Sequence, residues 1–214
     1  MIEATGIWYR RSGRVILRDV SLAVPQGSSL ALTGPSGSGK STLLALLAGL
    51  IRPDQGTIRL DGVDLNTLDP GALRRRTGIV FQSYGLLSLL TGAENVDLVQ
   101  QARGDSAASI AQVTARMLRA VNLSERGDHL VEELSGGEQQ RIAVARALVG
   151  DPDVVLADEP TAELDAENRQ RITALLLAVP TSGRTLILAT HDDEVAGVCS
   201  KIAHLGGGVL TAPH

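Results

Sequence analysis

The sequence has few aromatic residues, a single cysteine and no long apolar run. Cys199 stands alone, so the chain cannot form an internal disulfide, and this suits a reducing compartment. The longest stretch without a charged residue, 20–39, is too rich in Pro, Gly and Ser to cross a membrane. The first residues lack the basic and apolar segments of a signal peptide. We therefore expect a cytoplasmic protein, unless a partner holds it at a membrane.

A broad basic surface is also missing. The net charge of −4 argues against a general nucleic-acid binder, and we expect no nucleic-acid partner. The one basic cluster, Arg74–Arg76, is interpreted as a solvated turn or helix face. Aromatic residues make up only 2% of the chain, so the core must be aliphatic. The pairs Trp8–Tyr9 and Phe81–Tyr84 lie outside the aliphatic runs and suggest contact surfaces.

The 214 residues suffice for one α/β domain, 1–214, with a sizeable core. Residues 1–33 and 57–60 carry strand and turn signals, which predict an antiparallel β region. Apolar residues at helical spacing in 109–121 predict a helix, and we expect a helical subdomain at about 83–134. The nucleotide-binding core would then comprise 1–82 and 135–214, with a mainly parallel sheet.

A glycine-rich loop follows the apolar run 30–33 and precedes the helix-like run 43–47. It consists of Gly34, Pro35, Ser36, Gly37, Ser38, Gly39, Lys40, Ser41 and Thr42, and it reads G-x-x-x-x-G-K-S. In this strand–loop–helix context the pattern predicts a phosphate-binding loop, with backbone N–H groups around an anion. Lys40 would reach the β- and γ-phosphates, and Ser41 would bind Mg²⁺. A structural glycine turn is the alternative interpretation.

Polar residues follow three further apolar runs. Asp158 and Glu159 end the run from Val154, Gln82 ends 79–82, and His191 follows 185–190. In parallel sheets ligands bind at the carboxyl edge, so these side chains should converge on the loop. We expect Asp158 and Gln82 to hold Mg²⁺ with Ser41. Glu159 would polarise the attacking water, with His191 orienting it. The other histidines, His129, His204 and His214, are interpreted as structural or surface residues.

The stretch Leu134-Ser-Gly-Gly-Glu-Gln-Gln-Arg141 closely resembles the signature sequence of ATP-binding-cassette (ABC) ATPases. The other motifs then follow in family order over nearly the whole chain. The resemblance implies that Tyr9 stacks on adenine, that Gln82 is the Q-loop, and that Asp158 and Glu159 are the Walker B acid and catalytic glutamate. Residues 162–165 resemble the D-loop and His191 the switch histidine. Catalysis would depend on Glu159, His191, Gln82 and Lys40.

The resemblance also implies a shared site. Two such domains, copies or paralogues, would dimerise head to tail, and each would present one segment to the partner's ATP. That segment comprises Ser135, Gly136, Gly137 and Glu138, with Asp165 nearby. A Ser-Gly-Gly sequence before a helix is itself an anion-binding N-terminus, and Ser135 is a plausible N-cap. The surface near Gln82 and the helical subdomain would receive a membrane permease, which would hold the protein at the cytoplasmic face.

The sequence around residues 76–96 resembles a subgroup that serves lipoprotein release and macrolide or peptide export. Ala162–Glu163 stands where that subgroup has Gly-Asn, which places an extra acid near the expected dimer interface. DNA-repair ABC ATPases need long insertions, and translation-associated ones need two cassettes, for which this chain has no room. A role in which hydrolysis regulates a membrane partner by mechanotransmission, without transport, stays open beside transport.

Overall fold

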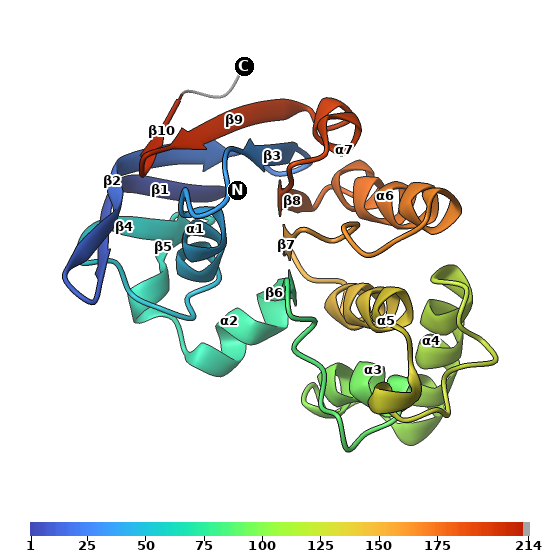
Figure 1. The fold of residues 1–214 in the computed structure, drawn as a ribbon. Helices are drawn as coiled ribbons and strands as arrows, with labels where there is room; N and C mark the ends of the chain where they lie inside the picture. Colours follow the sequence, from blue (N-terminus) through green and yellow to red (C-terminus); the bar gives the residue numbers. More distant parts are fainter. Residues whose placement is uncertain (212–214) are drawn as a thin grey trace.

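The structure is a computed structural model that describes residues 1–211, and it contains two β-sheets with helices packed around them (Figure 1). The first sheet is antiparallel, in the order β2-β1-β4-β5, and so confirms the expected antiparallel β region. Its strands are β1 (Ile2–Arg11), β2 (Arg14–Val24), β4 (Gln55–Leu60) and β5 (Val63–Asp64). The hairpin turn between β1 and β2 lies at Ser12–Gly13, where both residues have positive φ.

The second sheet has the order β10-β9-β3-β8-β7-β6, and it is parallel except for β10. Its strands are β3 (Ser29–Thr33), β6 (Thr77–Val80), β7 (Val154–Asp158), β8 (Thr185–Ala189), β9 (Lys201–Gly206) and β10 (Val209–Leu210). The predicted mainly parallel sheet is confirmed. One boundary was wrong: Gln82 lies beyond β6, because pairing with β7 ends at Val80 and the chain then turns.

Each face of the parallel sheet has its own aliphatic core. Leu32 and Leu156 pack with α1 (Lys40–Leu47) and the antiparallel sheet, whereas Ala31 and Val155 face the other cluster. That second face is covered by α5 (Gly136–Leu148), α6 (Ala166–Thr181) and α7 (Asp193–Gly197). Alternate residues of a strand point to opposite faces of the sheet. Because both faces are buried here, the central strands are continuous apolar runs.

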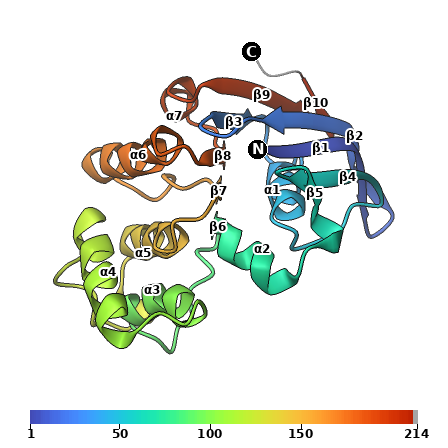
Figure 2. The ribbon, with the colours of Figure 1, turned by 180° about the vertical axis from the view of Figure 1, so that it is seen from behind.

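Two further helices lie together at one end of the molecule, against α5 (Figures 1 and 2). They are α3 (Gly92–Gln101) and α4 (Ala107–Ala120), and α4 confirms the helix predicted near 109–121. Helix α3 lies within the expected helical subdomain, although no apolar period in the sequence marks it. It begins with a capping box, because Thr91 Oγ1 accepts from Glu94 N–H and the Glu94 carboxylate accepts from Thr91 N–H.

A short helix, α2 (Pro70–Arg76), carries the basic cluster in its last turn. Arg74 and Arg75 are exposed, as expected, but the interpretation was wrong for Arg76. Its guanidinium forms ion pairs with Asp61, directly after β4, and with Asp153, directly before β7, and so links α2 to both sheets. These ion pairs join residues that are distant in sequence, so the composition of the basic cluster could not predict them. Between residues 1 and 211, no helix combines the length and apolar character that a membrane span requires.

Candidate functional site: a phosphate cavity at the carboxyl edge of the sheet

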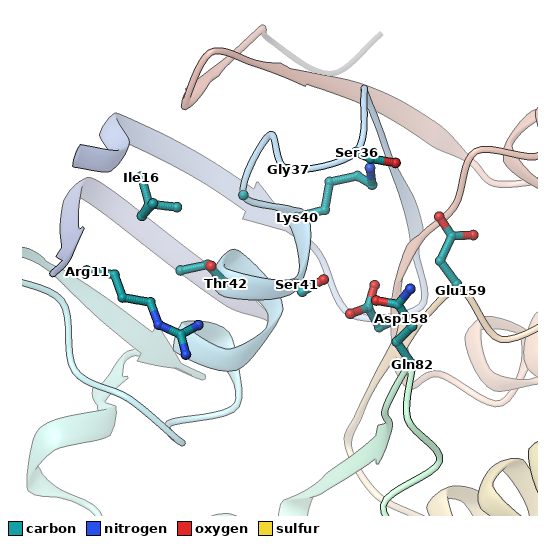
Figure 3. Close-up of a pocket in the computed structure, with 11 residues that line it drawn as sticks. Arg11, Ile16, Ser36, Gly37, Lys40, Ser41, Thr42, Gln82, Asp158 and Glu159 are labelled. Carbon is teal, nitrogen blue, oxygen red and sulfur yellow. The ribbon is translucent and has the colours of Figure 1, made fainter. Parts of the chain in front are cut away.

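A cavity of about 310 Å³ opens where β3, β6 and β7 end (Figure 3). This volume lies at the lower end of the range for small-molecule sites, roughly 300–1,000 Å³. The lining comes from the β1–β2 hairpin, the glycine-rich loop and two strand ends. It comprises Arg11, Ile16, Ser36, Gly37, Gly39, Lys40, Ser41, Thr42, Gln82, Asp158 and Glu159.

The glycine-rich loop is held in a conformation that side chains would prevent. Gly34 has φ +136, and a Cβ built on it would lie 2.1 Å from the Leu205 carbonyl oxygen. Gly39 caps α1 with φ +108, so the helix begins at Lys40 with its N-terminal amides at the cavity. The buried Lys40 ammonium donates to the carbonyls of Gly34 (2.7 Å) and Pro35 (3.3 Å). Free amides beside a cation suit an anionic ligand.

Three oxygen-bearing side chains point toward one another beside the loop: those of Ser41, Gln82 and Asp158 (Figure 3). The Ser41 hydroxyl lies beside the Asp158 carboxylate and favours its charged form. In residues 1–211 no three His, Cys, Asp or Glu side chains form a metal cluster. The three oxygen donors fit Mg²⁺, which prefers octahedral oxygen ligands and takes several from water and phosphates rather than from the protein.

The environment of Asp158 disfavours its charge. Burial is the main cause that raises the pKa of this carboxyl, and the nearby charge of Glu159 raises it further. The Ser41 hydroxyl and the Lys40 charge lower it, but the pKa stays raised overall. The side chain is buried without a full counter-charge. A cation arriving with a nucleotide would offset the repulsion between the two acids.

Replacing Asp158 by asparagine is expected to stabilise the nucleotide-free protein at pH 7. With a raised pKa, the folded state keeps the proton to a higher pH than the unfolded state, so stability falls as pH rises above about 4 through that raised value. The gain should vanish as pH drops below about 4, because both states become protonated there. Thermal unfolding between these pH values measures it. The exposed Asp105→Asn variant is the control, and a lower midpoint for Asp158→Asn at pH 7 would contradict the expectation.

Glu159 and His191 meet at the rim of the cavity. His191 Nδ1 lies 2.9 Å from Glu159 Oε2, and the histidine side chain is 73% exposed. Glu159 has a left-handed backbone (φ +49), and its N–H donates to the Ala189 carbonyl at the end of β8. This backbone pairing turns the glutamate out of β7 toward the cavity. The arrangement leaves one carboxylate oxygen free to accept a hydrogen bond from water.

Not every residue predicted for the site reaches the cavity lining. Tyr9 lies in β1 opposite Leu17 and packs half-buried against the core. Four further predicted residues do not line the cavity: Gly34, Pro35, Ser38 and His191. Arg11 and Ile16, which the sequence analysis missed, line it instead (Figure 3). Ile16 Cγ2 would lie 3.3 Å from a Cβ on Gly39, so the hairpin rests on the loop. No sequence signal distinguishes these two residues.

The Ser135–Glu138 segment lies outside the cavity of its own chain. Ser135 is the N-cap of α5, as predicted, and forms a capping box with Glu138. Burial raises the pKa of Glu138, but hydrogen bonds from Ser135 and the ion pair with Arg126 outweigh it, and the pKa is lowered. Asp165 caps α6 by accepting from Asn168 N–H. His129 and His204 also lie away from the cavity, and His214 lies outside the described residues.

Glu163 sits beside the amino end of α5. A Cβ built on Gly136 would lie 3.7 Å from Glu163 Oε2 and 3.1 Å from the Tyr84 hydroxyl. Burial and the Glu163 charge together raise the pKa of Tyr84. Tyr84, Gly136 and Glu163, which are distant in sequence, therefore lie together at the Ser135–Gly137 surface. Of these three residues, only Glu163 carries a charge.

The chain is similar to known proteins over most of its length. The family model described as ABC transporter matches residues 17–162. The uncharacterized ABC transporter ATP-binding protein YbbA of Escherichia coli is 45% identical over 200 residues, covering 91% of this chain and 88% of YbbA. The macrolide export ATP-binding/permease protein MacB of Rhodospirillum rubrum is 44% identical, covering 88% of this chain and 30% of MacB.

An uncharacterized ABC transporter ATP-binding protein of Mycobacterium tuberculosis, Rv2564, is 43% identical, and the match covers 87% of this chain and 58% of Rv2564. The chain thus spans well under two thirds of some relatives. Among solved structures, the dimeric post-hydrolysis state of the ATP-binding cassette MJ0796, bound to ADP and Pi, has a TM-score of 0.93 at 33% identity. It covers 100% of this chain and 98% of that one. The chain therefore belongs to the ABC transporter family, as one of its ATP-binding cassettes.

Proposed function

We propose that this chain hydrolyses ATP as one half of a head-to-tail dimer and drives conformational change in a membrane partner. One observation carries the proposal: the cavity gathers Lys40, Ser41, Gln82, Asp158 and Glu159, while the Ser135–Gly137 segment faces outward. A second cassette would supply that segment to complete the site. The match to a dimeric cassette bound to ADP and Pi supports this reading.

The side chains divide the chemistry between charge and positioning. Lys40 exchanges its two carbonyl partners for phosphate oxygens and neutralises their charge. Ser41, Asp158 and Gln82 would hold Mg²⁺, which supplies charge neutralisation at the phosphates. Glu159 accepts a hydrogen bond from the attacking water, and His191 fixes the carboxylate through its 2.9 Å contact.

The coupled system is proposed to be of the export or lipoprotein-release type. A relative at 44% identity is named for macrolide export and carries its permease in the same chain. We propose that residues 83–134 act as a helical subdomain beside the Gln82 surface. There they would receive an integral membrane subunit that holds the protein at the cytoplasmic face.

Reconstitution tests the proposal. The membrane subunit that co-purifies with the tagged chain is placed in lipid vesicles, and ATP hydrolysis is measured with and without it. We expect hydrolysis to need Mg²⁺ and to change when the partner is present. Vesicle transport of a macrolide separates export from mechanotransmission, in which hydrolysis responds to the partner without substrate movement. A cassette that stays monomeric with ATP would overturn the shared-site mechanism.

Glu163→Gln is expected to strengthen ATP-driven dimerisation. The Glu163 carboxylate lies beside Gly136, where the partner's phosphates would arrive, so two like charges oppose each other. In a Glu159→Gln background, light scattering should show dimers at several-fold lower ATP concentration, and high salt should shrink the gain through screening. Glu167→Gln on the nearby α6 is the matched control. An unchanged ATP requirement would show that Glu163 does not oppose assembly.

A further inference from the structure

The phosphate cavity has two chemically different ends (Figure 3). Glu159, which we assign to the attacking water, lies at one end, and Arg11 and Ile16 of the β1–β2 hairpin lie at the other. A triphosphate that is held by the glycine-rich loop, with its terminal phosphate at Glu159, directs its nucleoside toward the hairpin. The hairpin side chains therefore face the nucleobase of a bound nucleotide.

A β-bulge fixes the hairpin over the cavity. The register of β1 on β2 shifts by one residue at Ile16, which has no partner across the ladder. Such a bulge re-aims a side chain, and the Ile16 side chain lines the cavity. The Ile16 carbonyl is held between two glycines, because a Cβ built on Gly208 would lie 2.4 Å from its oxygen and one on Gly39 would lie 3.4 Å from it. Ile16 thus offers a fixed apolar surface for the face of a base.

Arg11 is the charged residue of the lining at this end of the cavity. In residues 1–211 its guanidinium forms no ion pair with a carboxylate. The carboxylate of Asp54, directly before β4, accepts instead from the backbone N–H of Arg10 (2.7 Å). Arg14, a second exposed cation, stands directly opposite Arg11 in the ladder. Like charges in opposite positions are unfavourable, so Arg11 gains from a ligand that brings hydrogen-bond acceptors.

The chemistry of a guanidinium distinguishes one purine from the other. This group can only donate hydrogen bonds, and it presents its donors in a planar fork. Guanine offers two adjacent acceptors to such a fork, O6 and N7. Adenine offers N7 beside its N6 amino group, which is itself a donor. A donor-only side chain at the nucleoside end of the cavity therefore favours guanine over adenine.

We propose that Arg11 is a specificity-determining residue of the nucleotide site, and that its guanidinium contacts the O6 and N7 acceptors of a guanine base. The cassette then accepts GTP as well as ATP. Inosine triphosphate carries the same two acceptors and behaves like GTP. The inference rests on the proposed function, because it requires that the cavity holds a nucleoside triphosphate, and it adds to that function the choice of base.

Calorimetric binding of ATP, GTP and inosine triphosphate, each with Mg²⁺, to the full chain tests the proposal. In Arg11→Ala we expect the affinity for GTP and inosine triphosphate to fall about five- to tenfold more than the affinity for ATP, the lower part of the range for a bidentate base contact because Arg11 is exposed. Arg14→Ala removes the same charge, and the same repulsion across the ladder, outside the cavity lining. It should leave the ratio of GTP to ATP affinity unchanged. Arg11→Lys keeps the charge but lacks the planar fork, so its ratio should resemble that of Arg11→Ala.

A base analogue tests the same contact in the wild type. A GTP analogue with carbon in place of N7 should bind more weakly than GTP, and this difference should disappear in Arg11→Ala. Equal losses of ATP and GTP affinity in Arg11→Ala would assign Arg11 to the phosphates alone and overturn the inference. A changed GTP-to-ATP ratio in Arg14→Ala, or an analogue effect that persists in Arg11→Ala, would overturn it too. In these cases the nucleotides still bind and the proposed function stands. If no triphosphate binds the wild type, the proposed function fails.

Discussion

Replacing Glu159 by glutamine is expected to leave ATP binding intact and to slow hydrolysis by about 10²–10⁴-fold, the range for losing a general base. Glutamine keeps the size of the side chain and can still contact His191 Nδ1, which now lies 2.9 Å from Oε2. It cannot take a proton from water. Nucleotide affinity should persist because it depends on Lys40 and the loop amides, which the substitution does not touch.

Equilibrium binding of labelled ATP and single-turnover hydrolysis separate the two effects. Glu194→Gln, on α7, removes the same charge outside the cavity lining and is the matched control. Normal turnover by the Glu159 variant would refute its role. If ATP binding and turnover were both lost, Glu159 would instead have a structural role at the carboxyl ends of β7 and β8, where its N–H donates to the Ala189 carbonyl.

Replacing Ser135 by alanine should impair hydrolysis by at least tenfold at saturating ATP while the monomer binds nucleotide normally. The hydroxyl lies at the amino end of α5, outside the chain's own cavity, so in the proposed dimer it would serve the partner's phosphates. The loss of one charge-assisted hydrogen bond of about 1.5–3 kcal/mol accounts for an effect of this size. Steady-state hydrolysis, with monomer binding measured below the dimerisation range, tests it.

The Ser135 variant also loses a helix cap, at a cost of about 1 kcal/mol of stability. Thr91→Ala removes the same kind of capping box from α3 and therefore serves as a matched control. Both variants should unfold at slightly lower temperature, and only the Ser135 variant should lose hydrolysis. Collapse of monomeric nucleotide affinity in the Ser135 variant would exclude the shared site.

The elements that could be predicted are those fixed by local sequence. Glycines at 34, 37 and 39 between an apolar strand and a helix allow few conformations, and acids directly after Val154–Ala157 must emerge at the strand's carboxyl end. The α5 N-cap followed from Ser135 alone. The T-x-x-E pattern at Thr91 was equally available as a signal for α3 and was overlooked, because the residues behind it lack a clear apolar period.

The missed features depend on contacts between distant segments. Arg11 and Ile16 reach the cavity because the β1–β2 hairpin packs on Gly39, which no local pattern encodes. The same tertiary geometry places Tyr9 against the core in this structure. The cavity lined by Arg74, Arg103 and Arg146 likewise joins residues that lie far apart in the sequence.

Helix α5 runs from the Ser135 cap to the cavity that Arg146 lines. Ser135 lies at its amino end and Arg146 near its carboxyl end, roughly 17 Å apart at about 1.5 Å per residue. The middle of the helix, around Ile142–Val144, is completely buried and packs beside β6. Because the centre of α5 is held in the core, we expect a displacement of its Arg146 end to be transmitted along the helix to its Ser135 end.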